Sequence, residues 1–260
     1  MEPPGTRRSS SQLAEEATGS RRPGIDVPRS TIRPVVLTLA ELGIEASGCT
    51  RCPLSAGRTQ VVFGVGDPEA DLMFVGEGPG HEEDRLGEPF VGRSGQLLDR
   101  LLREELGVGR DRVYIANVVK CRPPGNRDPR PEEIVACRPY LDRQIELIDP
   151  QVIVTLGNFA TRLLLGTEAG ITSLRGRAHP FGRAVIVPTY HPSYVLRAGS
   201  AGEPMAGIRA DLVRAHEHLA EGPRQNYLGG RRPRTIGPPG QISQGRASSF
   251  ATGREGSVAR

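Results

Sequence analysis

The sequence predicts an α/β fold: one three-layer domain in which helices flank a central, mostly parallel, four-stranded sheet. The first observation is that short apolar runs ending at glycine or proline alternate with longer segments in which apolar residues recur at helical spacing. Such alternation is typical of parallel strands joined by crossover helices. The second is that all of these segments lie between residues 34 and 220, a length sufficient for one sizeable core.

The predicted elements follow one another in the order that this fold requires. The helix over 35–46 has apolar residues at helical spacing, and the helix over 94–106 places five leucines on one face. The helix over 131–148 opens with Pro131 and two glutamates, which favour a first turn. Strands are predicted at 71–76, 113–119, 152–156 and 184–188, and further helices after Gly157 through 165 and over 207–219.

The two ends of the chain differ from this domain in composition. Residues 1–33 are rich in Pro, Ser, Gly and Arg, residues 221–260 hold seven arginines and two glutamates, and neither end shows an apolar period. We expect both to be disordered extensions, the second of them basic. Residues 1–220 carry 27 basic and 28 acidic groups, so nucleic-acid affinity of the domain requires a local basic patch. Lys120 is the only lysine, which we attribute to a compositional bias towards arginine.

The four cysteines predict a metal or cluster site. The sequence lacks a signal peptide and any apolar run of about 18 residues, which favours a cytoplasmic protein over a membrane protein. In that reducing compartment cysteines are ligands more often than disulfide partners. They are Cys49, Cys52, Cys121 and Cys137, spaced as C-x2-C, then 68 residues, then C-x15-C. Because structural zinc usually takes paired knuckles, this spacing favours a [4Fe–4S] cluster, with zinc and buried free thiols as the alternatives.

Three polar side chains lie at the ends of predicted strands. Glu77 follows the first strand, Asn117 lies near the end of the second, and His191 follows the fourth. Ligands of parallel sheets bind beyond the carboxyl ends of the strands. The sequence therefore predicts one pocket that contains all three side chains.

The loop after the first strand reads Gly76-Glu77-Gly78-Pro79-Gly80. Backbone can approach a planar ligand closely here, because Gly78 and Gly80 lack side chains. A dinucleotide fingerprint does not fit, since Pro79 removes an amide donor, we expect no helix directly after the loop, and the acids over 77–84 would repel a phosphate. The structural alternative is a plain tight turn.

Phe90 and Asn117 are suited to reading a base. Phe90, in a loop between Pro89 and Gly92, can stack on a flat base. Asn117 is costly inside an apolar strand unless it is satisfied, and its carboxamide complements the N3–H and O4 edge of uracil. The alternatives are an aromatic plug that seals the loop and a structural hydrogen bond.

His191-Pro192-Ser193 begins a turn after the fourth strand. A histidine there is as often a structural cap as a catalyst. The residues that follow, Tyr194, Leu196 and Arg197, would place an apolar wedge beside an arginine at an exposed tip. Such a wedge pushes a base out of a duplex and holds the gap.

Several motifs occur together between about residues 48 and 197. They are Cys49-x-x-Cys52-Pro53-Leu54, Gly76-Glu77-Gly78-Pro79-Gly80 with Glu83-Asp84, Gly87-Glu88-Pro89-Phe90-Val91-Gly92, Asn117-Val118-Val119-Lys120-Cys121-Arg122-Pro123-Pro124, Cys137, and His191-Pro192-Ser193. Together they resemble the family-4 uracil-DNA glycosylases, the bacterial and archaeal iron–sulfur branch. That family usually has alanine where this chain has Gly78. A covalently trapping branch carries a reactive histidine where this chain has residues 125–129 without one, so trapping chemistry is not expected.

The resemblance implies a uracil-DNA glycosylase-like fold and the hydrolysis of the N-glycosidic bond of uracil in DNA, which initiates base excision repair. It implies a structural [4Fe–4S] cluster held by the four cysteines. Carried over position by position, the residues that would contact uracil are Gly76, Glu77, Gly78, Phe90, Asn117 and His191. His191 would stabilise the negative charge on uracil O2, and Glu77 or Glu83 would orient the attacking water, a choice that the sequence leaves open. We expect a monomer that acts on uracil-containing DNA.

Two other functions remain open at this point. One is a glycosylase of the same fold for another deaminated base such as hypoxanthine, against which the pyrimidine-like edge of Asn117 argues. The other is a non-catalytic iron–sulfur DNA-binding subunit associated with a polymerase. The three polar side chains at strand ends weigh against it, and the absence of turnover on uracil-DNA would support it.

Overall fold

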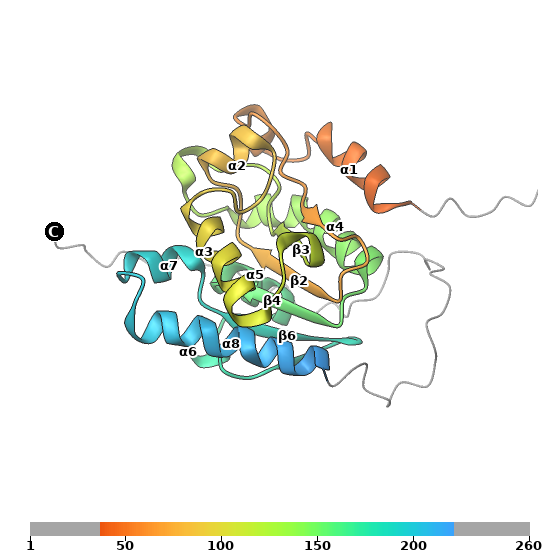
Figure 1. Cartoon of the computed structure of the whole chain (residues 1–260). Helices are drawn as coiled ribbons and strands as arrows, with labels where there is room; N and C mark the ends of the chain where they lie inside the picture. Colours follow the sequence, from red (N-terminus) through yellow and green to blue (C-terminus); the bar gives the residue numbers. More distant parts are fainter. Residues whose placement is uncertain (1–36, 221–260) are drawn as a thin grey trace, which may run out of the picture. The chain divides into compact units, whose positions relative to one another are not determined.

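Residues 37–220 are described by the computed structural model, and their centre is a six-stranded sheet (Figure 1). The strands are β1 (Val65–Gly66), β2 (Leu72–Gly76), β3 (Tyr114–Asn117), β4 (Val152–Leu156), β5 (His179–Phe181) and β6 (Ala184–Thr189). Their order across the sheet is β1-β3-β2-β4-β6-β5. The extensions predicted over 1–33 and 221–260 lie outside the described residues.

The four central strands are parallel to one another, as the sequence predicts. The two edge strands, β1 and β5, pair antiparallel with β3 and β6, so the sheet has six strands where four were predicted. Neither edge strand gives a periodic signal. β1 has 2 residues, and β5 reads His-Pro-Phe, with a proline that only an edge strand tolerates.

The helices connect these strands. They are α1 (Leu39–Ser47), α2 (His81–Leu86), α3 (Arg93–Leu101), α4 (Pro131–Ile148), α5 (Asn158–Leu165), α6 (Ile171–Leu174), α7 (Pro192–Arg197) and α8 (Gly202–Ala220). Four short segments are 3-10 or π-helical, namely η1 (Pro53–Ala56), η2 (Leu102–Leu106), η3 (Arg110–Arg112) and η4 (Pro124–Asn126). α4 and α5 have the predicted bounds, and α3 with η2 covers the helix predicted over 94–106. α8 begins at Gly202, earlier than predicted, and the short α7 was not predicted as a helix.

One expectation about the glycine loop is wrong. α2 begins at His81, directly after Gly80, where no helix was expected. Pro79 does not prevent this helix because it precedes the first turn. The first turn carries three acids, and the carboxylate of Glu83 accepts a hydrogen bond from the backbone N–H of Gly80 at 3.1 Å. Acids near a helix N-terminus satisfy free N–H groups and interact favourably with the helix dipole.

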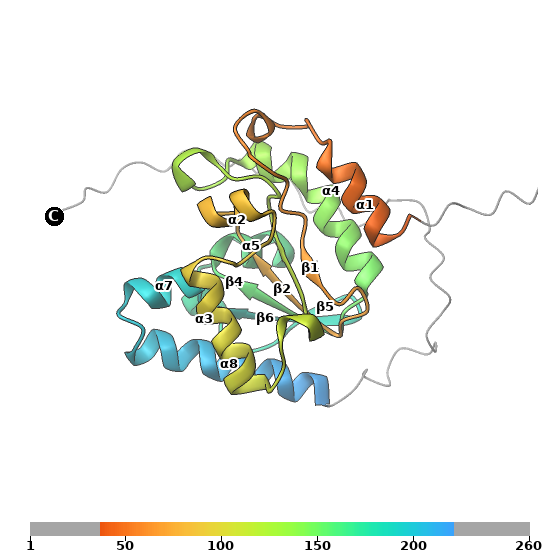
Figure 2. The ribbon, with the colours of Figure 1, turned by 45° about the horizontal axis from the view of Figure 1, so that its top comes forward.

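Successive side chains along each strand point to opposite faces of the sheet, so the core has two halves. Met73 and Val75 of β2 pack with α1, α4 and α5, whereas Leu72 and Phe74 pack with α3, η2 and α8. Figure 2 shows α1 and α4 on one side of the sheet and α3 and α8 on the other. Between residues 37 and 220, no helix has the length and apolar character needed to cross a membrane.

Candidate functional site

The carboxyl ends of the central strands bring the predicted site residues together. Gly76, the last residue of β2, pairs in register with Asn117, the last residue of β3. The backbone N–H of Gly157, after β4, donates to the carbonyl of Thr189 at 2.9 Å. A Cβ on Gly157 would lie 3.1 Å from Cβ of His191, so the chain after β6 runs tightly against the end of β4. We call the group of Gly76, Glu77, Phe90, Asn117 and His191 the strand-end site.

Asn117 is almost completely buried and leaves one atom without a partner. Its side chain is 1% exposed, and Oδ1 accepts no hydrogen bond from any described residue. A Cβ on Gly76 would lie 2.5 Å from this Oδ1 and 2.5 Å from Cζ of Phe90, so both side chains lie directly against the backbone of Gly76. An unpaired buried acceptor costs about 1–3 kcal/mol. A ligand N–H that reaches this atom would recover that cost.

Phe90 is held in a conformation that residues other than glycine seldom adopt. Its φ angle is 54°, in the left-handed region, which costs about 1–3 kcal/mol for such a residue. Its ring is buried and lies 5.7 Å from the ring of His191, measured between centroids. The surrounding structure must therefore hold the turn that contains Phe90.

Two charged side chains hold this turn by hydrogen bonds to its backbone. Glu83 of α2 accepts hydrogen bonds from the backbone N–H groups of Val91 at 3.0 Å and Gly92 at 2.8 Å. Arg110 donates to the carbonyls of Phe90 at 2.8 Å and Pro89 at 2.6 Å, and it also pairs with Asp99 at 3.0 Å. Backbone donors and acceptors of one turn are thus satisfied by charged groups, which form the stronger class of hydrogen bond.

The structure separates the two glutamates that the sequence could not separate. Both carboxylate oxygens of Glu83 are used by backbone N–H groups, those of Gly80, Val91 and Gly92. Glu77 is half-buried, and its carboxylate makes no hydrogen bond to a described residue. Burial and the nearby Asp128 raise the pKa of Glu77 to about 7, while the positive charge of Arg197 opposes that shift. Glu77 is therefore the carboxylate with free acceptor capacity.

His191 is held as a neutral ring with a defined tautomer. Its Nδ1 accepts a hydrogen bond from the backbone N–H of Ser193 at 3.1 Å and lies 2.8 Å from the Ser193 hydroxyl. Because the amide must donate, Nδ1 is unprotonated and the proton of the neutral ring is on Nε2. Burial, assisted by the positive charge of Arg197, lowers the pKa of His191 to about 4. Nε2–H is thus a donor at neutral pH.

Gly78 packs closely against the strand beside it. A Cβ there would lie 2.7 Å from Cγ2 of Val119, so an alanine would require Val119 to move. The glycine that departs from the usual family motif is thus matched to its neighbour in this chain.

The predicted wedge residues lie on α7, next to the strand-end site. Tyr194 is 44% exposed and contacts the ring of Tyr190 at a centroid distance of 5.1 Å. Arg197 is exposed and donates to the hydroxyl of Ser193 at 3.3 Å. Leu196 is half-buried and lines a cleft together with Arg93, Gln96, Leu97, Arg100 and Ser200. Tyr194 and Arg197 are therefore the more accessible of the three.

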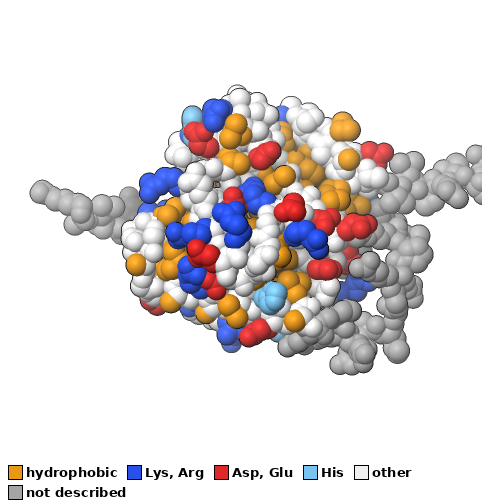
Figure 3. Space-filling model, in the orientation of Figure 1, with side chains coloured by type: hydrophobic (Ala, Val, Ile, Leu, Met, Phe, Trp, Pro, Cys, Tyr) orange, Lys and Arg blue, Asp and Glu red, His pale blue; other side chains and the backbone are white. Residues whose placement is uncertain are grey.

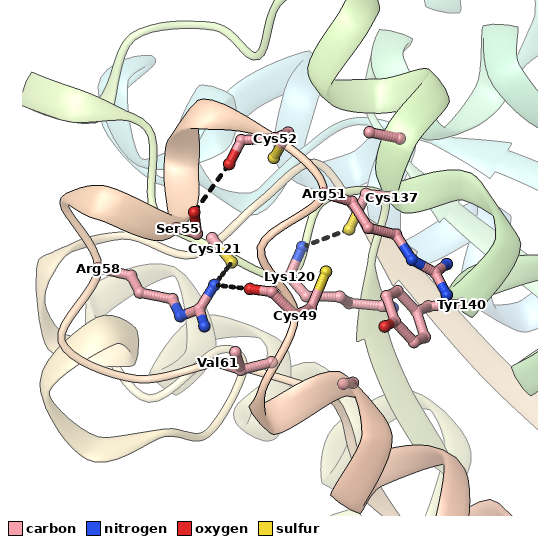
Figure 4. A pocket seen from close by; sticks show the side chains of 12 residues that line it. Cys49, Arg51, Cys52, Ser55, Arg58, Val61, Lys120, Cys121, Cys137 and Tyr140 are labelled. Atoms are coloured by element: carbon pink, nitrogen blue, oxygen red, sulfur yellow. Dashed lines mark hydrogen bonds between the residues drawn. The ribbon is translucent and has the colours of Figure 1, made fainter.

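The four cysteines line one pocket, although they come from three separate segments (Figure 4). Cys49 and Cys52 lie between α1 and η1, Cys121 follows β3, and Cys137 is on α4. All four thiols are free, and Figure 4 shows their sulfur atoms around a shared space. In residues 37–220, no three His, Cys, Asp or Glu side chains are close enough together to hold a single metal ion. We call this region the four-cysteine pocket.

The pocket supplies hydrogen-bond donors to its sulfur atoms. The backbone N–H of Lys120 donates to Sγ of Cys137 at 3.2 Å, and the guanidinium of Arg58 donates to Sγ of Cys121 at 3.4 Å. Burial raises the pKa of the Cys121 thiol to about 11 and also raises that of Cys137. A bound metal deprotonates its thiol ligands, and donors to the sulfurs stabilise the thiolates. The donor set of this pocket therefore fits an iron–sulfur cluster.

Comparison with known proteins identifies the family of this chain. The model of the Uracil DNA glycosylase superfamily matches residues 63–213. A type-4 uracil-DNA glycosylase of Sulfurisphaera tokodaii is 46% identical over 167 residues, which cover 61% of this chain and 76% of that protein. The chain belongs to the type-4 uracil-DNA glycosylases. A second type-4 member, from Thermotoga maritima, is 54% identical over 57% of this chain and 78% of its own length. A type-5 uracil-DNA glycosylase of Thermus thermophilus is less similar, at 38% identity over 49% of this chain and 62% of that protein.

Family membership confirms the resemblance that the motifs predict, but several supporting residues were missed. Asp84 belongs to a quoted motif, yet only the structure shows that it accepts hydrogen bonds from the backbone of Thr59 at 2.9 Å and Gln60 at 3.4 Å. It thereby ties this type-4 enzyme's cysteine-bearing segment to α2. Arg110 gave no signal, because it is one of many arginines. Lys120 did give a signal, because it is the only lysine, but a compositional bias towards arginine does not fully explain why a lysine occurs there.

Proposed function

We propose that this chain flips uracil out of DNA into the strand-end site and hydrolyses its N-glycosidic bond, which initiates base excision repair. The family to which the chain belongs supports this activity. The observation that carries it is the buried, unpartnered Oδ1 of Asn117, an acceptor placed for the N3–H of uracil. The amide group of the same side chain can donate to O4.

Recognition of the base would involve the other residues around that atom. Phe90 would stack on the ring, and the turn held by Glu83 and Arg110 keeps it in place. The base would also contact backbone atoms of Gly76, Glu77 and Gly78. Gly76 has no room for a Cβ.

The leaving group would be stabilised by His191. Cleavage of the bond from C1′ to N1 leaves the electron pair on uracil, and negative charge grows on O2. A neutral imidazole with its proton on Nε2 can donate a hydrogen bond to that oxygen without first taking up a proton. Because the charge exists mainly in the transition state, this interaction would accelerate cleavage more than it strengthens binding.

The attacking water would be oriented by Glu77. Its carboxylate has free acceptor capacity, whereas that of Glu83 is used by three backbone N–H groups. Glu83 would then act on the reaction by holding the loops, although the sequence made it an equal candidate. The pKa of Glu77, about 7, implies that the acceptor is fully available only above neutral pH.

The DNA would lie across the face that carries α3 and α7. Arginine side chains gather over this part of the surface (Figure 3). Arg93 and Arg100 line the cleft beside Leu196, where they could contact phosphates. Tyr194, Leu196 and Arg197 would fill the gap left by the flipped base, with Tyr194 the most exposed apolar group.

A [4Fe–4S] cluster held by Cys49, Cys52, Cys121 and Cys137 fits the four-cysteine pocket better than zinc. A zinc ion requires each sulfur ligand to lie about 2.3 Å from the metal, so the four sulfur atoms must be close together. A cluster occupies the space between more widely separated thiolates. When bound, the cluster would supply structural cross-links between the α1–η1 segment, the end of β3 and α4. We propose that the protein is a monomer and that it works in the cytoplasm.

The test of this function is the release of free uracil from a labelled oligonucleotide by the purified full chain. The oligonucleotides carry uracil, hypoxanthine or thymine at one position, in single and double strands. We expect release from uracil-containing DNA alone, with an intact abasic strand as the other product. Release of hypoxanthine at a similar rate would favour a broader glycosylase, and binding without release would favour the non-catalytic subunit.

A further inference from the structure

Lys120 differs from the other basic residues in both identity and position. It is the only lysine in a chain with 34 Lys and Arg residues. Its side chain is 1% exposed, so it contributes nothing to surface charge or solubility. Lysine is among the residues least often fully buried, and a buried one normally has a structural or functional reason. A compositional bias towards arginine does not explain why this one position keeps lysine.

The amine of Lys120 joins two buried acceptors. Nζ donates to the backbone carbonyl of Asn117 at 2.7 Å and to Oε1 of Gln144 at 2.5 Å. Gln144, on α4, is itself oriented, because its Nε2 donates to the carbonyl of Phe63 at 2.9 Å and to the hydroxyl of Tyr114 at 3.2 Å. The amide of Gln144 can therefore present only its oxygen to Lys120.

The backbone of Lys120 belongs to the four-cysteine pocket. Its N–H donates to Sγ of Cys137 at 3.2 Å, and its carbonyl accepts from the N–H of Val62 at 2.8 Å. Cys121 is the next residue along the chain. One residue thus contacts the proposed cluster site through its backbone and the base-reading asparagine through its side chain.

We propose that Lys120 is a positioning residue that couples the four-cysteine pocket to Asn117. The inference rests on the proposed function, in which Asn117 reads uracil. The hydrogen bond from Nζ fixes the peptide group that follows Asn117, and that peptide sets the direction of the carboxamide. Movement of the segment that carries Cys121 would therefore move the acceptor that uracil meets.

Arginine cannot take over this task, although the chain uses it almost everywhere else. A guanidinium presents five N–H donors in a fixed plane, and the space around Nζ offers the two acceptors named above. The remaining donors would be buried without partners. This explains why one lysine occurs here, and it makes Lys120→Arg a damaging change.

The test is a double-mutant cycle of Lys120→Met with Asn117→Ala, measured as single-turnover uracil release by iron-loaded full-length protein. Methionine fills a similar volume and has no donor. We expect Lys120→Met to be roughly tenfold slower than the wild type, the scale of one coupled pair, and to cause no further loss once Asn117 is alanine. Iron content and visible absorbance of Lys120→Met should remain those of the wild type, since the backbone donor to Cys137 is kept.

A loss of the same factor in both backgrounds would overturn the proposal, because Lys120 would then act independently of Asn117. The same is true of a variant that melts earlier but cleaves at the wild-type rate. The control is Leu212→Ala, which removes a buried side chain of α8 on the other side of the sheet and should lower only the melting temperature. Inactivity of the wild type would instead refute the proposed function.

A second variant keeps the test decisive if Lys120→Met does not fold. Gln144→Met removes the acceptor that orients the amine but retains Lys120. We expect a smaller loss of rate, again absent when Asn117 is alanine. A wild-type rate with normal iron content in this variant would contradict the coupling.

Discussion

The strand-end site and the four-cysteine pocket are stabilised by different means. In the strand-end site, the carboxylate of Glu83 and the guanidinium of Arg110 hold the turn that contains Phe90, and Ser193 fixes the tautomer of His191. In the four-cysteine pocket, one donor reaches Sγ of Cys121 and one reaches Sγ of Cys137, and burial raises the pKa of both thiols. The first region is organised by the chain itself, whereas the second would be completed by the proposed cluster. Substitutions should therefore affect rate in the first region and stability in the second.

The largest effect on rate is expected for His191→Ala. The loss of one donor to a developing oxyanion lowers cleavage by roughly 10²–10³-fold. Binding of uracil-containing DNA should change far less, because Phe90 and Asn117 still hold the base. Single-turnover cleavage and DNA affinity, measured on the same preparation, separate the two. A folded variant with a near-normal rate would remove His191 from the mechanism.

The raised pKa of Glu77 predicts how the cleavage rate depends on pH. Its carboxylate is ionised only above a pKa of about 7, so single-turnover rate should fall as pH is lowered through 7, whereas His191 stays neutral down to about 4. Glu77→Gln should be slow and lose this dependence. The raised pKa means that the folded state loses stability as pH rises from about 4.5 to 7, so the variant should melt above the wild type at pH 8. An unchanged pH profile in Glu77→Gln would exclude Glu77 as its cause.

Arg110→Met tests whether the turn needs its second support. The substitution removes both hydrogen bonds to the carbonyls of Pro89 and Phe90, and Phe90 can then leave its left-handed conformation. We expect a rate roughly tenfold lower, the scale of losing one coupled interaction. Arg138→Met is the matched control, because Arg138 forms only a partly exposed pair with Asp142 on α4. Equal rates for the two variants would show that Glu83 alone holds the turn.

The smallest effect on rate is expected in the other region. Cys137→Ser should abolish the brown colour and the broad absorbance near 400 nm (roughly, for cysteine-ligated iron–sulfur clusters), and it should lower the melting temperature. The rate per folded molecule should fall by less than about tenfold, the loss transmitted through Lys120. A colourless wild type that contains one zinc would refute the cluster. If Cys137→Ser loses its absorbance and is as inactive as His191→Ala, the two regions do not differ in their effects on rate and stability.

Much of this architecture can be predicted from sequence, because its signals are local. The four central strands and α4 follow from apolar runs and a proline at a helix start. Glu77, Asn117 and His191 are recognisable because each is a polar residue at the end of an apolar strand. Their convergence follows from the parallel topology alone.

The supporting contacts cannot be predicted in this way. Glu83 bonds backbone groups of Val91 and Gly92, and Arg110 bonds the carbonyl of Phe90, so each depends on a fold that brings distant segments together. Because every residue has a backbone, a hydrogen bond to a backbone group cannot be recognised from the identity of the partner residue. Lys120 is the exception, since its identity as the only lysine was visible, but its partners were not.

The central claim is that Asn117 presents a preformed acceptor to the N3–H of uracil. The most direct measurement compares free uracil, 1-methyluracil and 3-methyluracil as inhibitors of single-turnover cleavage. The 3-methyl compound lacks the donor and leaves Oδ1 unpaired, so we expect it to inhibit at least about tenfold more weakly than uracil. The 1-methyl compound carries a methyl group of the same size on N1, where the sugar is attached in DNA, and it should inhibit about as well as uracil. Equal inhibition by 1-methyluracil and 3-methyluracil would contradict the account.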